Sequence, residues 1–319
     1  MRTRPLDTTG LSVSEICLGT MQFLWSIGEE DSHAILDAFF EAGGNFIDTA
    51  DMYSQWVPGL AGGEAEGVIG RWMKKKRNRD RIVLATKVRC RMWPGPDGEG
   101  LGEKHVLRAC DESLKRLQTD RIDLYQSHWP DQAVPIEETL GAYANLIRQG
   151  KVRFAGCSNY PGRALEEALA KSGKGRARTV SVQPCYNLLK RGEFEREILP
   201  IVRREGLAVI PYSPLAGGFL TGKYRRGQPL PKSVRAKQIR SQHFSEGDLS
   251  VVELLEKLSK DSGRTVAQTA LAWILSHDWV TAPIIGATSL AQLRECLGAG
   301  GLKLAPAEKD LIDRATRDR

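Results

Sequence analysis

Ionisable and hydrogen-bonding side chains stand at the ends of successive apolar segments of this 319-residue chain. Asp48 ends the second segment and Tyr53 follows it, Lys87 ends the third and His128 ends the fourth. Such side chains can hold, donate and accept protons, as general acids and bases do. Alone, Asp48 and Lys87 could be an ordinary ion pair, and a lone histidine is more often structural. Their repetition at three successive segment ends predicts a catalytic site.

The later segments also end in polar or small residues, which are Ser158 and Asn159, Gln183, Tyr212 and Ser213, and Gly286 and Ala287. Neither the six cysteines nor the five histidines has a metal-ligand spacing such as C-x-x-C or H-E-x-x-H. We therefore expect no metal in the site.

Short apolar segments bounded by turn-forming residues predict eight β-strands. Most are continuous rather than alternating, as expected of strands covered on both faces. The segments are Ser14–Leu18, Asn45–Asp48, Ile82–Lys87, Asp123–His128, Phe154–Ser158, Val180–Gln183, Ala208–Tyr212 and Thr281–Ile285. Helical patterns lie between them, so we expect parallel strands joined by helical crossovers.

Eight strand–helix units predict an α/β fold of the (β/α)8, or TIM, barrel type. A doubly wound sheet is the alternative, but no G-x-G-x-x-G string follows an early strand. We expect residues 1–319 to form a single barrel domain with an N-terminal hairpin and long loops at its C-terminal face. The long gap between Tyr212 and Thr281 must hold an additional excursion.

The composition excludes several classes of protein. Hydrophobic residues make up 41% of the chain, which is enough for a sizeable core. The net charge of +7 is weak support for a polyanion, because acidic residues are interleaved with the basic ones and no nucleic-acid motif accompanies them. No apolar run suggests a membrane span or a signal sequence, and the cysteines form no disulfide framework. We therefore expect a cytoplasmic protein without nucleic-acid or membrane partners.

The segment Gly44–Tyr53 resembles the signature of the aldo-keto reductase superfamily, in which an Asp and a Tyr lie five residues apart after the second strand. Lys87 and His128 complete the family's Asp-Tyr-Lys-His tetrad. This resemblance implies that Tyr53 gives a proton to a substrate carbonyl and that Lys87 lowers the pKa of the phenol. Asp48 would hold Lys87, and His128 would orient the carbonyl.

The resemblance also implies a nicotinamide dinucleotide bound without a Rossmann motif. Ser158, Asn159 and Gln183 would hold its carboxamide, and Tyr212 would stack on the nicotinamide. The pyrophosphate would be wrapped by the backbone of a glycine-containing segment, to which Ser213, Pro214, Leu215 and Gly217 belong.

The segments around Lys223 and Arg235 resemble the long cofactor-covering loop of one branch of the family, which includes the voltage-gated potassium channel β subunits. These two side chains would meet phosphates, or they could be solvated loop charges. The resemblance also implies that a later segment binds the 2′-phosphate and adenine. Its residues at that site would be Gly286, Ala287, Thr288, Gln292 and Glu295.

Two positions depart from the pattern of many relatives. Thr288 stands where many have Arg or Lys, and Cys296 stands where many have Asn, which bonds adenine differently. We expect NADPH as the cofactor, with NADH left open.

Four tryptophans, Trp25, Trp56, Trp93 and Trp129, lie just after the first four strands. They would line a substrate pocket suited to flat or apolar carbonyl compounds or sugar faces, or they could pack loop bases. We predict an NADPH-dependent reductase of aldehydes or ketones. The alternatives are an NAD(P)-dependent alcohol or sugar dehydrogenase working in the oxidative direction, and a cofactor-loaded regulatory or binding subunit. The natural substrate and the oligomeric state do not follow from the sequence.

Overall fold

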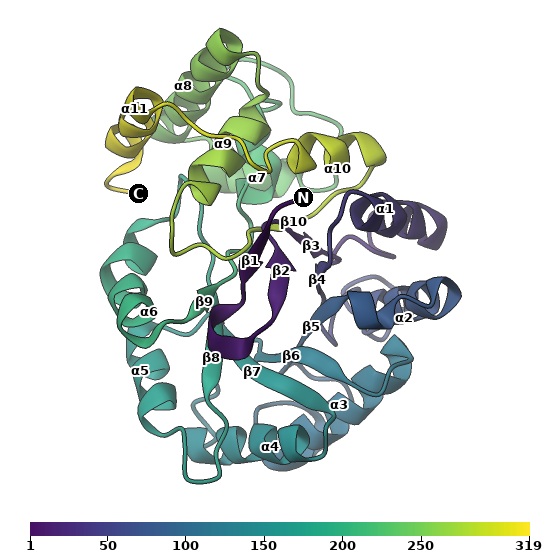
Figure 1. Cartoon of the computed structure of the whole chain (residues 1–319). Helices are drawn as coiled ribbons and strands as arrows, with labels where there is room; N and C mark the ends of the chain where they lie inside the picture. Colours follow the sequence, from purple (N-terminus) through teal and green to yellow (C-terminus); the bar gives the residue numbers. More distant parts are fainter.

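Eight parallel strands form the centre of the molecule in a computed structural model that describes all residues, 1–319 (Figure 1). They pair in the order β10-β3-β4-β5-β6-β7-β8-β9. Backbone N–H groups of Thr281 and Ile284 donate to the carbonyls of Val209 and Pro211, both at 2.8 Å, and so join the two edges. The strands are β3 (Cys17–Gly19), β4 (Phe46–Asp48), β5 (Val83–Val88), β6 (Ile122–Ser127), β7 (Val152–Ser158), β8 (Thr179–Gln183), β9 (Ala208–Val209) and β10 (Ile284–Ile285). The predicted (β/α)8 fold is confirmed.

Helices surround the strands and connect each one to the next (Figure 1). The predicted excursion between β9 and β10 contains α7 and α8 in addition to α9. No helix has both the length and the apolarity needed to cross a lipid bilayer. The helices are α1 (Glu29–Glu41), α2 (Glu64–Lys76), α3 (Glu103–Leu117), α4 (Ile136–Arg148), α5 (Gly162–Ala170), α6 (Leu199–Glu205), α7 (Ala236–His243), α8 (Glu246–Ser262), α9 (Val266–Leu275), α10 (Leu290–Leu297) and α11 (Pro306–Thr316).

The predicted N-terminal hairpin is present as β1 (Thr3–Pro5) and β2 (Ser12–Ser14), which pair antiparallel. Its Leu6 and Val13 are buried in one cluster with barrel residues such as Phe46, so the hairpin closes the N-terminal end of the barrel. Ser14 belongs to this hairpin rather than to the first barrel strand. β2 ends at this residue, whose hydroxyl donates to the Ile16 carbonyl at 2.8 Å and whose N–H donates to Asn45 Oδ1 at 2.7 Å.

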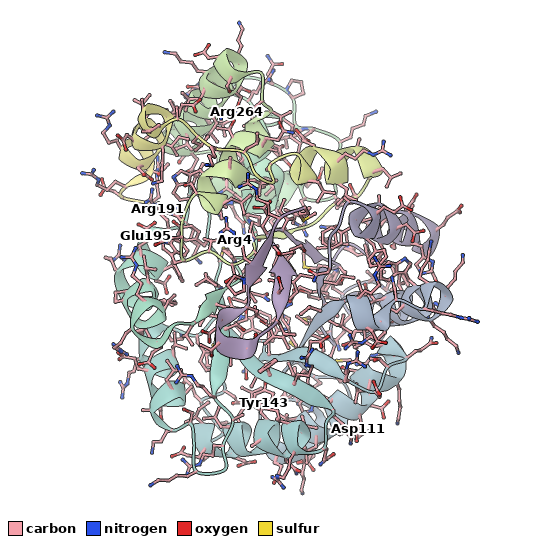
Figure 2. The ribbon with its side chains drawn as sticks, viewed as in Figure 1. Arg4, Asp111, Tyr143, Arg191, Glu195 and Arg264 are labelled. Atoms are coloured by element: carbon pink, nitrogen blue, oxygen red, sulfur yellow. The ribbon has the colours of Figure 1, made fainter.

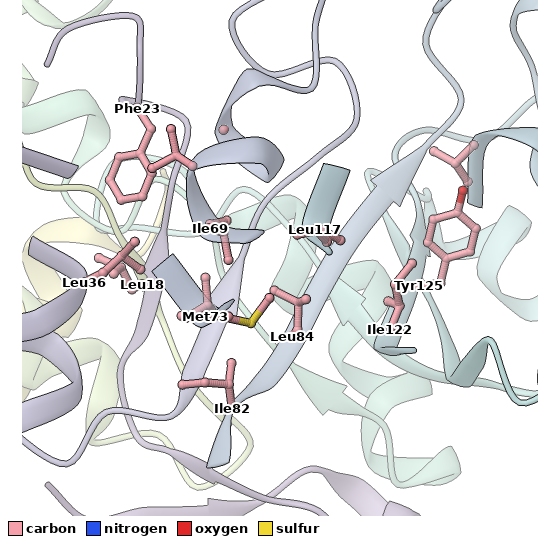
Figure 3. Close-up of a cluster of buried hydrophobic side chains, with 14 of the residues drawn as sticks. Leu18, Phe23, Leu36, Ile69, Met73, Ile82, Leu84, Leu117, Ile122 and Tyr125 are labelled. Carbon is pink, nitrogen blue, oxygen red and sulfur yellow. The ribbon is translucent and has the colours of Figure 1, made fainter. Parts of the chain in front are cut away.

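Side chains alternate between the barrel interior and the helical layer, and this alternation positions the site. In β5, Leu84 and Val88 pack in the cluster between the strands and the helices α1–α4 (Figure 3). Val83 and Ala85 face the interior, and the alternation sends Lys87 there as well. In β6, Tyr125 packs outward and Leu124 inward, so the residues two and four positions after Leu124 also point into the barrel.

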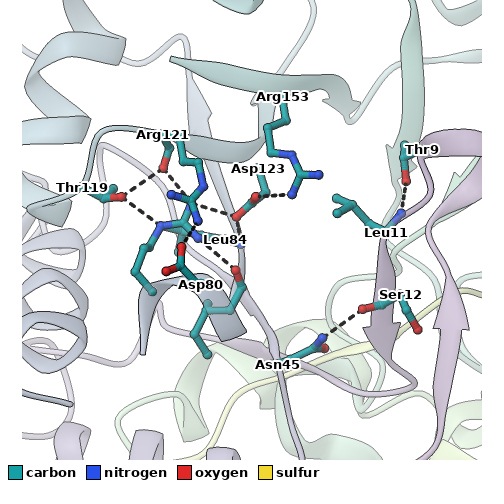
Figure 4. Close-up of polar contacts among 12 residues, drawn as sticks. Thr9, Leu11, Ser12, Asn45, Asp80, Leu84, Thr119, Arg121, Asp123 and Arg153 are labelled. Atoms are coloured by element: carbon teal, nitrogen blue, oxygen red, sulfur yellow. Dashed lines mark hydrogen bonds and ion pairs between the residues drawn. The ribbon is translucent and has the colours of Figure 1, made fainter. Parts of the chain in front are cut away.

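The N-terminal ends of the strands are tied together by a buried carboxylate (Figure 4). Asp123, only 1% exposed, accepts hydrogen bonds from the Leu84 N–H at 2.9 Å and from Arg153 at 3.0 Å. Arg79 forms a further ion pair with it at 2.8 Å. At this face of a (β/α)8 barrel such contacts serve stability rather than catalysis.

The buried imidazole of His277 should make the free energy of unfolding depend on pH. Its ring lies between Trp273, at 4.7 Å, and Trp279, at 4.8 Å, and burial together with the Lys309 and Arg191 cations lowers its pKa to about 4. The unfolded chain binds a proton at this histidine below about pH 6.5, whereas the folded protein does not until about pH 4. The free energy of unfolding should therefore decrease as the pH falls from 6.5 to 4.

Urea denaturation at pH 7 and pH 5 measures this effect. His277→Gln should make the pH dependence shallower, without abolishing it, because burial also lowers the pKa values of His105, His128 and His243. An unchanged difference between the two pH values would contradict the prediction.

Candidate active site

Lys87 is the centre of a buried network at the C-terminal ends of β4 and β5. Its ammonium donates to Asp48 Oδ1 at 2.5 Å, to the Thr49 carbonyl at 2.8 Å and to the Tyr53 hydroxyl at 3.0 Å. Lys87 and Asp48 are 1% and 2% exposed. All three ammonium protons thus have partners, and the cation is fixed against the phenol oxygen.

The second oxygen of Asp48 is held by two amides. Gln183 Nε2 donates to Asp48 Oδ2 at 2.9 Å, and Gln126 Nε2 donates to the same oxygen at 3.1 Å. Gln126 is absent from the set of residues predicted from sequence. Its position two residues before His128 was the available signal, because alternate residues of a strand share a face.

Charge and burial act in opposite directions on the network. Burial works to lower the pKa of Lys87, but the Asp48 carboxylate and the Tyr53 oxygen raise it overall. Burial raises the pKa of the Tyr53 phenol, and the Lys87 charge only partly opposes it. Lys87 thus acts in the expected direction, but the pKa of Tyr53 stays above its ordinary value, because loss of water disfavours the phenolate more than the ammonium favours it. Tyr53 keeps its proton at neutral pH.

His128 flanks Tyr53 at the end of β6. The two ring centroids are 6.1 Å apart, and the imidazole stacks on Trp129 at 4.0 Å. Burial, with the nearby charges of Lys87 and Arg89, lowers the pKa of His128 well below its ordinary value, so the ring is neutral. Its Nδ1 is buried without a hydrogen-bond partner. The site therefore offers a neutral phenol and a neutral imidazole, both able to hydrogen-bond a carbonyl oxygen.

The four residues expected to hold and stack on a carboxamide lie together. Ser158 Oγ donates to the Gln183 carbonyl at 2.8 Å, and Tyr212 OH donates to Asn159 Oδ1 at 2.8 Å. Asn159 Nδ2 donates to the His128 carbonyl at 2.9 Å. Since Gln183 also bonds Asp48, these side chains and the Lys87 network form one connected unit.

The loop after β9 turns through residues with left-handed backbone conformation. Ser213, Ala216, Gly217 and Gly218 have φ of 53°, 48°, 67° and 101°. Such turns bring backbone N–H groups to one side and create a concave site for an anion. The loop includes the remaining predicted residues Pro214 and Leu215, and the Leu215 carbonyl accepts the N–H of Gly218 at 2.8 Å.

Lys223 and Arg235 lie beside this loop. A methyl group at Gly218 would be 3.1 Å from Lys223 Nζ, and one at Gly217 would be 4.0 Å from Arg235 Nη1. Neither cation forms an ion pair, and Arg235 Nη2 is buried without a partner. Burial lowers the pKa of both side chains. Two cations without ion-pair partners beside this turn suit a phosphate-bearing ligand.

The segment after β10 leads into the first turn of α10. The Gln292 side-chain oxygen accepts both the N–H and the hydroxyl of Thr288, each at 3.0 Å, and Ser289 caps the helix. The Glu295 carboxylate partly opposes the lowering of the pKa of Lys223. This segment therefore lies near the loop after β9. Gly286 and Ala287 connect β10 to this turn.

Three of the four predicted tryptophans lie around Tyr53 and His128. Trp56 is 6.3 Å from the Tyr53 ring and 5.4 Å from Trp25, and Trp129 stacks on His128. Trp56 and Trp129 are 41% and 39% exposed, so both offer apolar surface to a ligand. Trp93 is placed differently: it packs on His105 at 4.9 Å and carries the Arg108 guanidinium on its face at 4.0 Å, which ties it to α3.

Comparison with known proteins gives one consistent picture. A sequence model described as the aldo/keto reductase family matches residues 15–317. An uncharacterized oxidoreductase of Bacillus subtilis is 38% identical, covering 94% of this chain and 91% of its own. L-glyceraldehyde 3-phosphate reductase of Escherichia coli is 31% identical (100% and 93%), and a probable voltage-gated potassium channel subunit beta of Arabidopsis thaliana is 31% identical (100% and 98%). The resemblance to this branch, drawn from the motifs, is confirmed.

Proposed function

Because the chain belongs to the aldo/keto reductase family and is an oxidoreductase, we propose that it reduces an aldehyde or ketone to an alcohol with NADPH. The observation that carries the proposal is the buried contact of the Lys87 ammonium with both Asp48 and the Tyr53 hydroxyl. An ammonium in this position stabilises a phenolate at the moment the phenol gives up its proton. The reaction is reversible in principle.

The residues present fit a nicotinamide dinucleotide. Arg235 Nη2 is a buried donor without a partner, and Lys223 lies beside the turn at Gly218, also without an ion-pair partner. In the proposal Ser158, Asn159 and Gln183 hold the carboxamide. Phosphates are held by the loop after β9 with Lys223 and Arg235, and by the first turn of α10. The chemistry that this group supplies when bound is hydride transfer to the carbonyl carbon.

The protein's own residues manage the proton and the carbonyl oxygen. His128, neutral at physiological pH, orients the oxygen by a hydrogen bond. Tyr53 transfers its proton to that oxygen as it becomes an alkoxide, which is a much stronger base than a phenolate. Lys87 stabilises the phenolate left behind, and Asp48 keeps Lys87 in place with the help of the two glutamine amides.

Arg235→Ala distinguishes NADPH from NADH binding. A guanidinium that bonds the 2′-phosphate contributes a charge-assisted interaction, so its loss should weaken NADPH binding roughly ten- to a hundredfold. NADH lacks that phosphate and should bind almost as in the wild type. Fluorescence titration with each cofactor measures the effect, and equal losses for both would remove the assignment of Arg235 to the 2′-phosphate.

The proposed function itself is tested by titrating the protein with NADPH and NADH and then adding a panel of carbonyl compounds. We expect NADPH to bind more tightly and to be oxidised when an aldehyde is added. Failure of both cofactors to bind would overturn the proposal. Binding without turnover of any carbonyl compound would favour a regulatory role, such as the name of the channel β-subunit relatives suggests for those proteins.

A further inference from the structure

Arg89 is a half-buried cation without a partner in the chain. It follows Lys87 by two residues, directly after the end of β5. Its guanidinium forms no ion pair, and its Nε is buried without a hydrogen-bond acceptor. Partial removal of a charge from water is unfavourable unless an anion compensates it, so this half-buried guanidinium suits an anionic ligand supplied from outside.

Apart from Arg235, the other arginines that are at least half-buried have hydrogen-bond acceptors. Among those labelled in Figure 2, Arg191 bonds Glu195 at 2.7 Å and Asp313 at 3.1 Å, and Arg264 contacts the carboxylate of Glu308. Arg4 donates to the Leu275 carbonyl at 2.8 Å. Only Arg235 shares with Arg89 a buried guanidinium nitrogen that lacks an acceptor.

The strand register places Arg89 beside His128. Lys87 pairs with Gln126 across β5 and β6, and the backbone N–H of His128 donates to the Val88 carbonyl at 2.9 Å. Because Val88 pairs with Ser127, the residues that follow these two strand ends, Arg89 and His128, lie next to each other. The charge of Arg89 also contributes to the lowered pKa of His128, in agreement with this neighbourhood.

The backbone holds Arg89 in an uncommon conformation. Its φ is 152°, outside the regions that non-glycine residues usually occupy, and its carbonyl accepts the Gly100 N–H at 2.8 Å. Conformations of this kind concentrate at ligand-binding positions, where the surrounding structure imposes them. The loop from Gly100 thus fixes where the side chain begins.

The proposed cofactor does not account for this cation. Its phosphates are assigned to the loop after β9, to Lys223 and Arg235, and to α10, whereas Arg89 follows β5 and lies beside His128. We propose that Arg89 binds a carboxylate or phosphate group of the carbonyl substrate, and so makes the enzyme selective for anionic aldehydes or ketones. This inference rests on the proposed function. The planar fork of a guanidinium suits either anion through paired hydrogen bonds.

A matched pair of aldehydes tests the proposal. 4-Formylbenzoate and 4-formylbenzamide have nearly the same shape and differ in charge, so the ratio of their kcat/KM values isolates recognition of the anion. We expect the wild type to prefer the benzoate and Arg89→Ala to reduce that ratio roughly ten- to a hundredfold, with turnover of the amide retained. A second ratio, of kcat/KM for glyceraldehyde 3-phosphate to kcat/KM for glyceraldehyde, measures recognition of a phosphate in the same way. Comparison of the two ratios shows which anion Arg89 prefers.

Arg91→Ala is the control. Arg91 lies two residues further in the same loop, but it is exposed and already bonds Glu99 and the Gly95 carbonyl, so both ratios should stay at the wild-type value. Arg89→Gln, which keeps length and polarity, is measured beside Arg89→Ala, and thermal unfolding should show both variants at least as stable as the wild type, because an unpaired charge is lost. Ratios that are the same in wild type, Arg89→Ala and Arg89→Gln would overturn the proposal. Absence of turnover for every aldehyde in the wild type would instead overturn the proposed function.

Discussion

Replacing Tyr53 by phenylalanine should reduce kcat for carbonyl reduction by about 10²–10⁴-fold, which is the usual contribution of a positioned proton donor. The change removes one oxygen atom, the atom that Lys87 contacts at 3.0 Å. The aromatic ring can remain in place against Trp56 and His128, so the pocket should keep its shape. Cofactor affinity should change little, because no residue assigned to the cofactor bonds the Tyr53 hydroxyl.

Steady-state kinetics and cofactor titration of the same variant measure both parts of this result. Tyr143→Phe is the matched control: it also deletes one buried phenol oxygen, but that oxygen bonds Ser127 at 2.9 Å between β6 and α4, on the outer side of the barrel. Its kcat should match the wild type. Full activity of Tyr53→Phe would show that another group donates the proton.

Replacing Lys87 by methionine should remove activity and also destabilise the fold. The variant leaves the Asp48 carboxylate buried, with the amides of Gln126 and Gln183 as its remaining partners. Breaking a buried ion pair from one side costs about 3–5 kcal/mol, because the remaining charge is uncompensated. The phenolate of Tyr53 would also lose the cation that stabilises it.

A second variant separates these two effects. The double change Asp48→Asn with Lys87→Met removes both charges, so urea denaturation should show recovery of much of the lost unfolding free energy. Activity should stay at the level of Lys87→Met, because no ammonium faces Tyr53. A double variant as unstable as the single one would contradict the assignment of the cost to an unpaired Asp48. Recovery of activity would show that Lys87 has no electrostatic role in proton transfer.

Much of the site could be predicted because the positions of β-strands can be recognised in the sequence. Strand ends of a parallel barrel meet at one face, so Asp48, Lys87 and His128 converge although long stretches of chain separate them. The alternation of side chains along β6 also predicts Gln126, which does not stand out in the sequence because it is not ionisable. Local sequence patterns therefore carry information on which side chains meet.

Properties that depend on the surroundings of a side chain could not be predicted in this way. The balance that raises the pKa of Tyr53 depends on how completely other segments exclude water from it. The packing of Trp93 on α3 depends on loop paths that no short motif encodes. The lack of a partner for Arg89 is visible only once every acidic side chain has been placed.

Transfer of a hydride and a proton to a carbonyl group at this site is tested most directly by a single-turnover experiment. The protein is loaded with an equal amount of NADPH, mixed with excess 4-formylbenzamide and followed by nicotinamide absorbance while the alcohol is quantified. We predict one alcohol formed for each NADPH oxidised in the wild type, and almost none over the same time with Tyr53→Phe. NADPH that binds but is not oxidised by any aldehyde of the panel, or is oxidised without formation of the alcohol, would contradict the account.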